Sequence, residues 1–374
     1  MRRIIFWIHF VCGLATGIAI LIMSVTGVLL TYERQMLESA RAGSVQPADG
    51  AVALTADEVV AAAISAGAGP GATITLTREA RLPVVVSKGR RDSLLLDSYT
   101  GAPVEDAAAG ANTFFSRITA IHRWLAFTGT RTEAGAAVMG VSNLVFGLLL
   151  LTGAVLWWPK MWKWAFVKTQ LFFRRGLPNA KARHYNWHHV LAAWAAVPLA
   201  AIILSGAVFS YAWANRLVYA AFGEVPPQRG AAASPGDGPA ESLAPPSEIT
   251  TYAEAVARAV DTEPHWRRVI LTLPAPAAPH IAVTVDRGNG AQASARTALL
   301  VSRDAARPGV TVAVDASTPA GRARRFVRFL HTGEVYGWIG QTIAGLASLA
   351  AVVLVYTGLS LGIRRLVRMR RTSR

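Results

Sequence analysis

Four of the eight histidines lie where a long apolar stretch begins, or shortly before one. They are His9, His122, His188 and His331. A neutral imidazole can ligate a metal ion, and an imidazole can also transfer protons near neutral pH. Ionisable side chains are costly within a membrane and usually have a function there. These four histidines are therefore the first candidates for chemistry.

Four apolar stretches surround these histidines. The chain has 374 residues, of which 52% are hydrophobic and only 16% are charged. A helix needs about 20 apolar residues to cross the hydrocarbon core of a bilayer, and each stretch is long enough. The first is too long for the apolar part of a signal peptide, so we expect a retained anchor. The stretches are approximately Ile4–Leu30, Gly135–Trp158, Trp187–Trp213 and Trp338–Ile363.

The charged residues predict the orientation of these helices. Segment 159–186 carries seven Lys and Arg residues and no acid, and the tail after Ile363 carries six arginines and no acid. Positive residues favour the cytoplasmic side, so we expect both termini and segment 159–186 in the cytoplasm. The basic residues flank membrane helices, which argues against nucleic acid as a partner. The single cysteine, Cys12, excludes an intrachain disulfide and a cysteine-ligated iron–sulfur cluster within this chain.

The predicted fold class is an integral membrane protein, mainly α, with a bundle of four transmembrane helices and two small α+β extracytoplasmic modules. The predicted helices are 1–32, 133–158, 187–213 and 331–363. The segments between and after them are 33–132 and 214–330 outside, and the loop 159–186 and the tail 364–374 inside.

Each outer segment has the pattern of a helix followed by strands. In the first, 55–67 is typical of a helix, 72–79 and 82–89 of strands, and 92–106 of a strand running into a turn at Gly101. The second begins with a Pro/Gly-rich linker, 225–247, and continues with a helical pattern at 251–260 and strands at 266–274 and 280–288.

The membrane helices resemble one unit used twice. A shift of 179 residues places His9 on His188 and Thr26-Gly27 on Ser205-Gly206. All four helices carry a Thr-Gly or Ser-Gly pair far from a histidine, and small residues let helices approach closely in bilayers. Two parallel halves related by an axis along the membrane normal would follow.

This topology sorts the four histidines into two pairs. His9 and His188 begin helices that leave the cytoplasm, whereas His122 and His331 precede helices that enter from outside. Two neutral imidazoles from different helices can hold a haem iron from opposite sides. From His9 to Gly27 the helix rises by about 27 Å, so the pairs belong near opposite membrane surfaces. We therefore predict two haem groups, with these four histidines as cofactor-binding axial ligands of the haem iron.

Other roles for these histidines stay open. A mononuclear zinc or iron site would usually add Asp, Glu or Cys ligands, and Glu334 is the one acid close to either pair in sequence. A proton path is disfavoured because the helix interiors contain no Asp or Glu. His265 and His280 are expected at the surface, and His184 is expected to be solvated in the basic loop.

His188 and His189 cannot both face one iron, because neighbours on a helix differ in direction by about 100°. The 179-residue register selects His188 as the ligand. The role of His189 is unknown.

Several motifs resemble those of the PepSY-associated transmembrane proteins. "IHRWL" (121–125) and "FLHTGEVYGWIGQTIAGLASL" (329–349) resemble helix segments of that family, as do "WIHFVCGL" (7–14), "SVTGVLLTYE" (24–33), "WHHVLAAW" (187–194) and "LSGAVFSY" (204–211). "LLLDSYTGAPVED" (94–106) resembles the end of a PepSY domain. The family includes iron-regulated inner-membrane proteins and ferric-siderophore reductases with two b-type haems. The resemblance implies haem ligands at the same four histidines, two groups of the haem b type, and a location in the bacterial inner membrane. Relatives commonly have arginine where this chain has His189.

Two functions fit these observations. The first is transmembrane electron transfer through two haem b groups, from a quinol or a cytoplasmic flavoprotein to an outer ferric chelate such as a ferric siderophore. Arg117, Arg123, Arg325 and Arg328 near the outer histidines could hold haem propionates or an anionic chelate. The second is a haem-free PepSY membrane anchor that binds or regulates an extracytoplasmic peptidase or signalling partner. No catalytic residue, no identity of the acceptor and no oligomeric state follow from the sequence.

Overall fold

The chain folds into two compact units, each assembled from separate stretches of sequence. The computed structural model describes residues 1–374 except 80, 90–91, 160, 162, 228–248, 313–317 and 373–374. The membrane unit contains Met1–Glu33, Phe114–Pro226 and Pro319–Arg374, and the sheet unit contains Arg34–Thr113 and Pro227–Thr318. Most of the predicted linker 225–247 lies outside the described residues.

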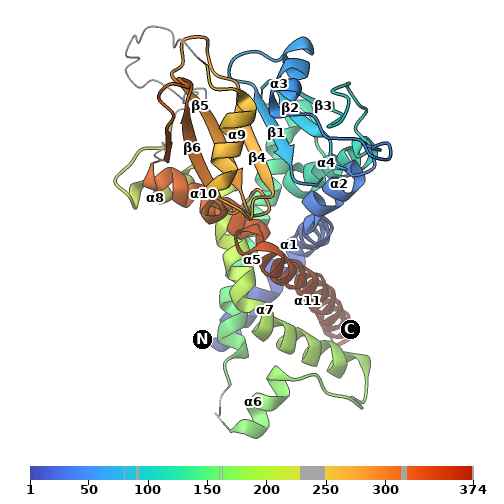
Figure 1. The fold of residues 1–374 in the computed structure, drawn as a ribbon. Helices are drawn as coiled ribbons and strands as arrows, with labels where there is room; N and C mark the ends of the chain where they lie inside the picture. Colours follow the sequence, from blue (N-terminus) through green and yellow to red (C-terminus); the bar gives the residue numbers. More distant parts are fainter. Residues whose placement is uncertain are drawn as a thin grey trace. The chain divides into compact units, whose positions relative to one another are not determined.

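Four long helices form the core of the membrane unit (Figure 1). They are α1 (Arg2–Leu30), α5 (Thr132–Trp157), α7 (Ala180–Ser210) and α11 (Gly337–Thr372). These are the four helices in the described residues that are long and apolar enough to cross a membrane. Each packs against its two neighbours in the order α1, α5, α7, α11, which closes a four-helix bundle. The chain is therefore a multi-pass membrane protein.

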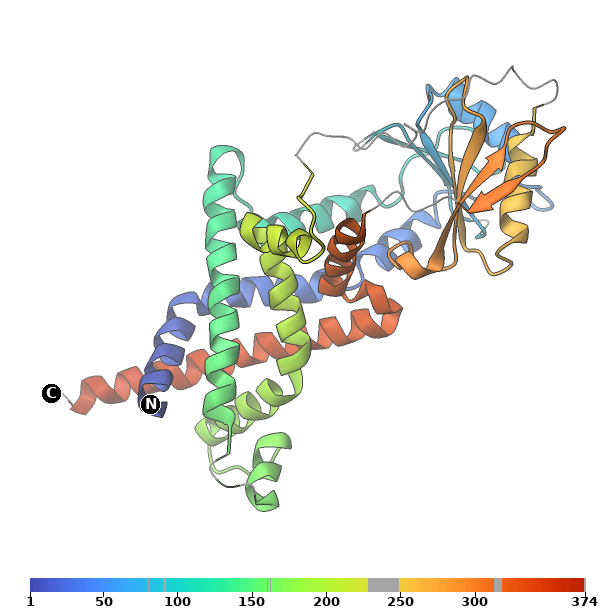
Figure 2. The same ribbon diagram turned by 90° about the vertical axis from the view of Figure 1, so that its left-hand side faces the viewer.

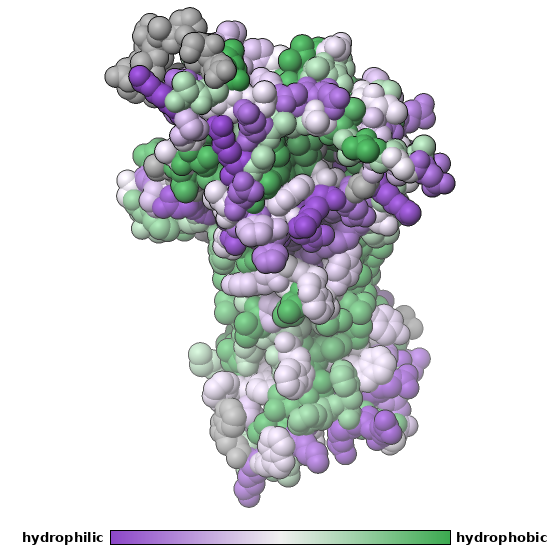
Figure 3. Space-filling view, in the orientation of Figure 1, coloured by the Kyte–Doolittle hydropathy of each residue, from purple (hydrophilic) through white to green (hydrophobic). Residues whose placement is uncertain are grey.

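Shorter helices lie at the two ends of this bundle. Both termini and α6 (Trp164–Leu171) lie at one end, and α4 (Ala109–Trp124), α8 (Ala212–Ala220) and α10 (Pro319–Thr332) lie toward the other (Figures 1 and 2). Hydrophobic side chains cover the middle of the membrane unit, and hydrophilic ones gather near its termini (Figure 3). This distribution matches a bundle whose middle lies in hydrocarbon.

Two sharp turns separate α4 from α5 and α10 from α11. Leu125 and Ala126 adopt φ of 56° and 59° after α4, a conformation that costs non-glycine residues about 1 kcal/mol each. In the second turn Gly333 has φ of 75°, and a 3-10 helix, η3 (Glu334–Tyr336), follows. The predicted bounds of the fourth membrane helix, 331–363, included His331; in the structure His331 lies on α10, because the chain turns at Gly333 before α11 begins.

The sheet unit contains one antiparallel sheet of seven strands in the order β3-β2-β1-β4-β5-β6-β7. The first outer segment supplies β1 (Thr73–Thr77), β2 (Val84–Ser87) and β3 (Ser93–Leu96). The second supplies β4 (Arg268–Thr272), β5 (His280–Asp286), β6 (Arg296–Ser302) and β7 (Val310–Val312). At the centre β1 pairs with β4, with Ile74 opposite Leu271. The last two strands, β6 and β7, were not expected.

The two predicted modules therefore share one sheet and one core. Helices α3 (Ala56–Ser65) and α9 (Tyr252–Asp261) pack on the same face, over buried residues of both segments (Figure 2). Asp57 on α3 accepts hydrogen bonds from the backbone N–H groups of Tyr252 and Ala253 at the start of α9. A separate module would leave an exposed strand edge at β1 and another at β4, and pairing removes both edges. A last helix, α2 (Glu33–Arg41), joins the sheet through the ion pair of Glu38 with Arg268, 2.6 Å long.

Candidate functional site

The four candidate histidines form two pairs inside the membrane unit. The ring centres of His9 on α1 and His188 on α7 are 6.4 Å apart. The ring centres of His122 on α4 and His331 on α10 are also 6.4 Å apart. The structure thus brings together the residues that the sequence analysis paired, at the same separation in both places.

In the first pair, each imidazole contacts a Thr-Gly pair on a neighbouring helix. Nδ1 of His9 lies 2.9 Å from the hydroxyl of Thr152 on α5. Nδ1 of His188 lies 3.0 Å from the hydroxyl of Thr357 on α11. Both threonines are buried. The pair is therefore held by all four long helices.

The second pair repeats this arrangement. Nδ1 of His122 lies 2.8 Å from the hydroxyl of Thr26 on α1, and Nδ1 of His331 lies 3.0 Å from the hydroxyl of Ser205 on α7. Thr26 and Ser205 are also buried. The helices that carry His9 and His188 thus supply the hydroxyls for the other two histidines.

Helix geometry fixes which ring nitrogen carries the proton. The four hydroxyls donate to a backbone carbonyl one turn earlier on their own helices, at 2.6 to 2.7 Å. A hydroxyl has one hydrogen, so each can only accept from the imidazole. In agreement, Nδ1 of His188 also reaches the carbonyl of Leu354, and Nδ1 of His331 that of Ile202. Nδ1 therefore carries the proton, and the lone pair of Nε2 is available to a metal.

The glycine after each hydroxyl residue makes room for the imidazole. A Cβ atom at Gly153 would lie 3.4 Å from Cε1 of His9, and one at Gly358 would lie 3.3 Å from Cε1 of His188. At Gly206 the distance to Cε1 of His331 would be 3.4 Å, and at Gly27 the distance to Cε1 of His122 would be 3.8 Å. The Thr-Gly and Ser-Gly pairs were interpreted as helix-packing devices. In the structure they also bind and orient the rings.

The two pairs lie far apart along the bundle. Thr26 follows His9 by 17 residues on α1, and Ser205 follows His188 by 17 residues on α7. Seventeen residues of helix rise about 26 Å, close to the thickness of the hydrocarbon core. The pairs are therefore two separate sites near opposite ends of the membrane span.

Comparison with known families agrees with this architecture. The family described as the PepSY-associated TM region matches residues 6–365. The chain belongs to this family. No curated protein is significantly similar to the chain.

The other histidines of this PepSY-associated TM protein do not join either pair. His189 donates from Nδ1 to the carbonyl of Tyr185 on its own helix, and its ring lies against that of Tyr185, with centres 4.0 Å apart. His184 was expected to be solvated, but it is buried on α7 and contacts the hydroxyl of Ser360 at 2.9 Å. That prediction was wrong because α7 begins at Ala180, so His184 faces α11. His265 and His280 lie in the sheet unit.

An aromatic and an arginine beside His331 were not singled out from the sequence. The ring of Phe209 on α7 lies 5.4 Å from that of His331. The guanidinium of Arg324 lies over Phe209 at 4.5 Å and donates to the side-chain oxygen of Asn215 at 2.7 Å. The arginines of α10 could be recognised in the sequence, but the sequence did not show that Arg324 is the one that contacts the ring of Phe209.

The arginines proposed earlier for an anionic ligand have different surroundings. Arg123 lies over the ring of Trp124 at 4.6 Å, and Arg328 lies over Phe329 at 5.6 Å. Like Arg117 and Arg325, they belong to α4 and α10, the helices that hold His122 and His331. This end of the membrane unit is therefore basic close to the second pair.

Proposed function

We propose that this protein binds two haem b groups and carries electrons across the bacterial inner membrane to an outer ferric chelate. The observation that carries the proposal is the pair of histidines, found twice, with ring centres 6.4 Å apart. His9 and His188 would hold one haem iron, and His122 and His331 the other.

The separation of the rings supports ligation of a single iron between them. A metal–imidazole bond is about 2 Å long, and a ring centre lies about 1 Å behind its nitrogen, so two rings on opposite sides of one metal have centres roughly 6 Å apart. If the two imidazoles of each pair only packed against each other, nothing would require the distance between their ring centres to be the same 6.4 Å in both pairs.

The ligand set favours haem over a bare metal ion. A protein zinc site uses three or four protein ligands. In the part of the chain that the structure describes, no group of three or more His, Cys, Asp or Glu residues could hold a metal ion. Haem would need only two histidines from the protein at each site, because the macrocycle supplies the other ligands of the iron.

The protein's own residues hold and orient the ligands. The hydroxyls of Thr152, Thr357, Thr26 and Ser205 fix the proton on Nδ1 and leave Nε2 for the iron. Bound haem would supply one-electron chemistry between Fe(III) and Fe(II). With both termini cytoplasmic, as the basic segments favour, the His9–His188 pair lies on the donor side.

A ferric chelate is the acceptor that we propose for the other side. Arg123, Arg325 and Arg328 belong to the helices that hold the second pair, and they would attract an anionic chelate. Hard oxygen ligands bind the less charged Fe(II) more weakly, so reduction would release iron for uptake. A quinol or a cytoplasmic flavoprotein would supply the electrons.

Proteoliposomes test this function. The purified protein is reconstituted with an impermeant ferric chelate outside and a reductant inside, and Fe(II) formation outside is followed with a chromogenic chelator. We expect reduction with the wild-type protein and none with His9→Ala or His331→Ala. Equal rates with wild-type protein, both variants and empty liposomes would contradict the proposal and favour a haem-free anchor.

A further inference from the structure

A hollow of about 660 Å³ lies between the first half of α7, the loop that precedes it and α11. Trp187 and Leu191 from α7, Val353 from α11 and Phe173 form its apolar wall. The rest of the lining is Gly176, Leu177 and three arginines, Arg174, Arg175 and Arg183.

The loop that brings these arginines to the hollow is fastened to α7. The buried Asn186 accepts a hydrogen bond from the backbone N–H of Arg174 at 3.0 Å and donates one to the carbonyl of Thr169 at 3.0 Å. The indole of Trp194 donates to the carbonyl of Leu171 at 2.9 Å. The hollow is thus formed by packed and hydrogen-bonded elements.

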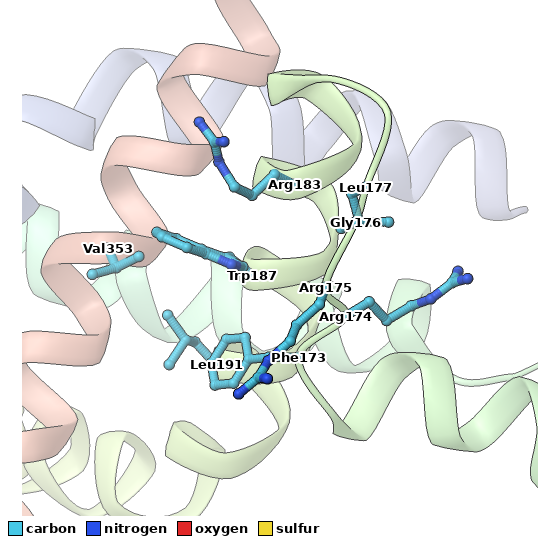
Figure 4. A pocket seen from close by; sticks show the side chains of 9 residues that line it. All are labelled: Phe173, Arg174, Arg175, Gly176, Leu177, Arg183, Trp187, Leu191 and Val353. Atoms are coloured by element: carbon cyan, nitrogen blue, oxygen red, sulfur yellow. The ribbon is translucent and has the colours of Figure 1, made fainter.

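The side chains divide the hollow into an apolar centre and charged margins. The indole of Trp187 lies between Arg183 and Leu191, and the guanidinium of Arg175 lies beside Phe173, whereas Arg174 points away (Figure 4). No hydrogen bond or ion pair within the described residues engages the side chains of Arg175 and Arg183. Segment 159–186 contains no Asp or Glu to neutralise them.

These features select the chemistry of a ligand. Arginine binds phosphate oxygens in a bidentate manner, and two unneutralised arginines call for an anion. A quinol would need a carboxylate or a histidine to accept its protons, and the lining has neither. The apolar wall continues along α7 and α11, two helices that can cross the membrane. A ligand with a phosphate and a long apolar chain satisfies both parts.

We propose that this hollow is a specific site for an anionic phospholipid. Its phosphate would contact an arginine at a charged margin, Arg175 or Arg183, and one acyl chain would run over the apolar centre formed by Phe173, Trp187, Leu191 and Val353. The site is independent of haem binding, since neither arginine belongs to a histidine pair.

Native mass spectrometry tests this site on the full-length protein. The protein is equilibrated with phosphatidylglycerol in an excess of phosphatidylcholine, and retained lipids are counted. We expect one retained phosphatidylglycerol per chain, and a loss of affinity of roughly tenfold or more in the double variant Arg175→Gln/Arg183→Gln. The matched control, Lys168→Gln/Lys181→Gln, removes equal charge from the same segment outside the hollow and should retain the lipid.

Two further arms distinguish the sources of the phosphate. Phe173→Ser should weaken phosphatidylglycerol binding while leaving that of soluble glycerol 1-phosphate unchanged. The proposal is overturned if glycerol 1-phosphate binds as tightly as the lipid, or if the lysine control loses the lipid as fully as the arginine variant. Absence of retained phosphatidylglycerol on the wild-type protein would also overturn it. An unchanged haem content in all variants keeps this result separate from the proposed function.

Discussion

At the scale of single residues, the partners of Nδ1 in each histidine are as informative about the site as the position of Nε2, the nitrogen proposed to bind iron. Each candidate histidine donates from Nδ1 to a buried Thr or Ser on another helix. The sequence could identify the histidines from their positions and the repeat. It could not match each hydroxyl to its histidine, because that match depends on which helices pack together.

His188 and His189 should respond differently to substitution. His188→Ala removes the imidazole that faces His9 and should lower haem content by about half, because one of two axial ligands is lost. His189→Ala removes a ring that bonds to its own helix and should leave haem content unchanged. The amount of haem per chain in each variant, measured by pyridine haemochrome absorbance, shows whether His188 or His189 is the ligand. Equal losses in both variants would contradict the assignment of His188.

The hydroxyl of Thr152 should strengthen haem binding at the His9–His188 pair without being a ligand itself. Thr152→Val keeps the shape but removes the acceptor for His9, and loss of such a partner typically costs about 10–100-fold in metal affinity. The measurement is haem retention against apomyoglobin as a competing acceptor. Thr16→Val is the control, since the hydroxyl of Thr16 bonds only to the carbonyl of Cys12 on α1. A Thr152 variant that retains haem as the control does would refute this role.

At the scale of elements, two turns place the second pair, His122 and His331. His122 lies two residues before Trp124, and a Cβ atom at Gly135 on α5 would lie 2.1 Å from the carbonyl oxygen of Trp124. His331 lies two residues before Gly333. A Cβ atom at Gly340 on α11 would lie 2.2 Å from the carbonyl oxygen of Gly333. The long helices could be predicted from apolar length alone. The first of these turns could not, because Leu125 and Ala126 are not residues that favour a positive φ.

Gly135→Ala should therefore disturb one site and spare the other. The added methyl group cannot fit against the backbone of Trp124, so α4 must move away from α5 and carry His122 with it. In low-temperature absorption spectra of the reduced protein, we expect loss of the haem proposed for His122 and His331, with the haem proposed for His9 and His188 retained. Gly110→Ala on α4 meets nothing within 4 Å and serves as the control. Full retention of both haems in the Gly135 variant would show that this contact does not position His122.

At the scale of the whole molecule, both units are built from segments distant in sequence. Local patterns predicted α3, α9 and five of the seven strands near their observed positions. They did not predict that β1 would pair with β4, because strand pairing across nearly two hundred residues leaves no local periodicity. The family match over residues 6–365 fits this interdependence, since neither unit is continuous in the chain.

The shared core predicts that damage to one segment will spread to the other. Leu271→Ala on β4 empties space opposite Ile74 on β1, and such a substitution costs about 2–5 kcal/mol. Hydrogen exchange followed by mass spectrometry should show lost protection in 73–77 as well as in 268–272. Loss confined to the second segment would mean that the two segments fold separately.

The most direct test of the proposed function is the haem content of the full-length protein made with ample haem. We expect about two haem b groups per chain, seen in the difference between dithionite-reduced and oxidised spectra and counted by pyridine haemochrome. We expect about one in His9→Ala/His188→Ala and about one in His122→Ala/His331→Ala. Folded protein that contains no haem under these conditions would contradict the account.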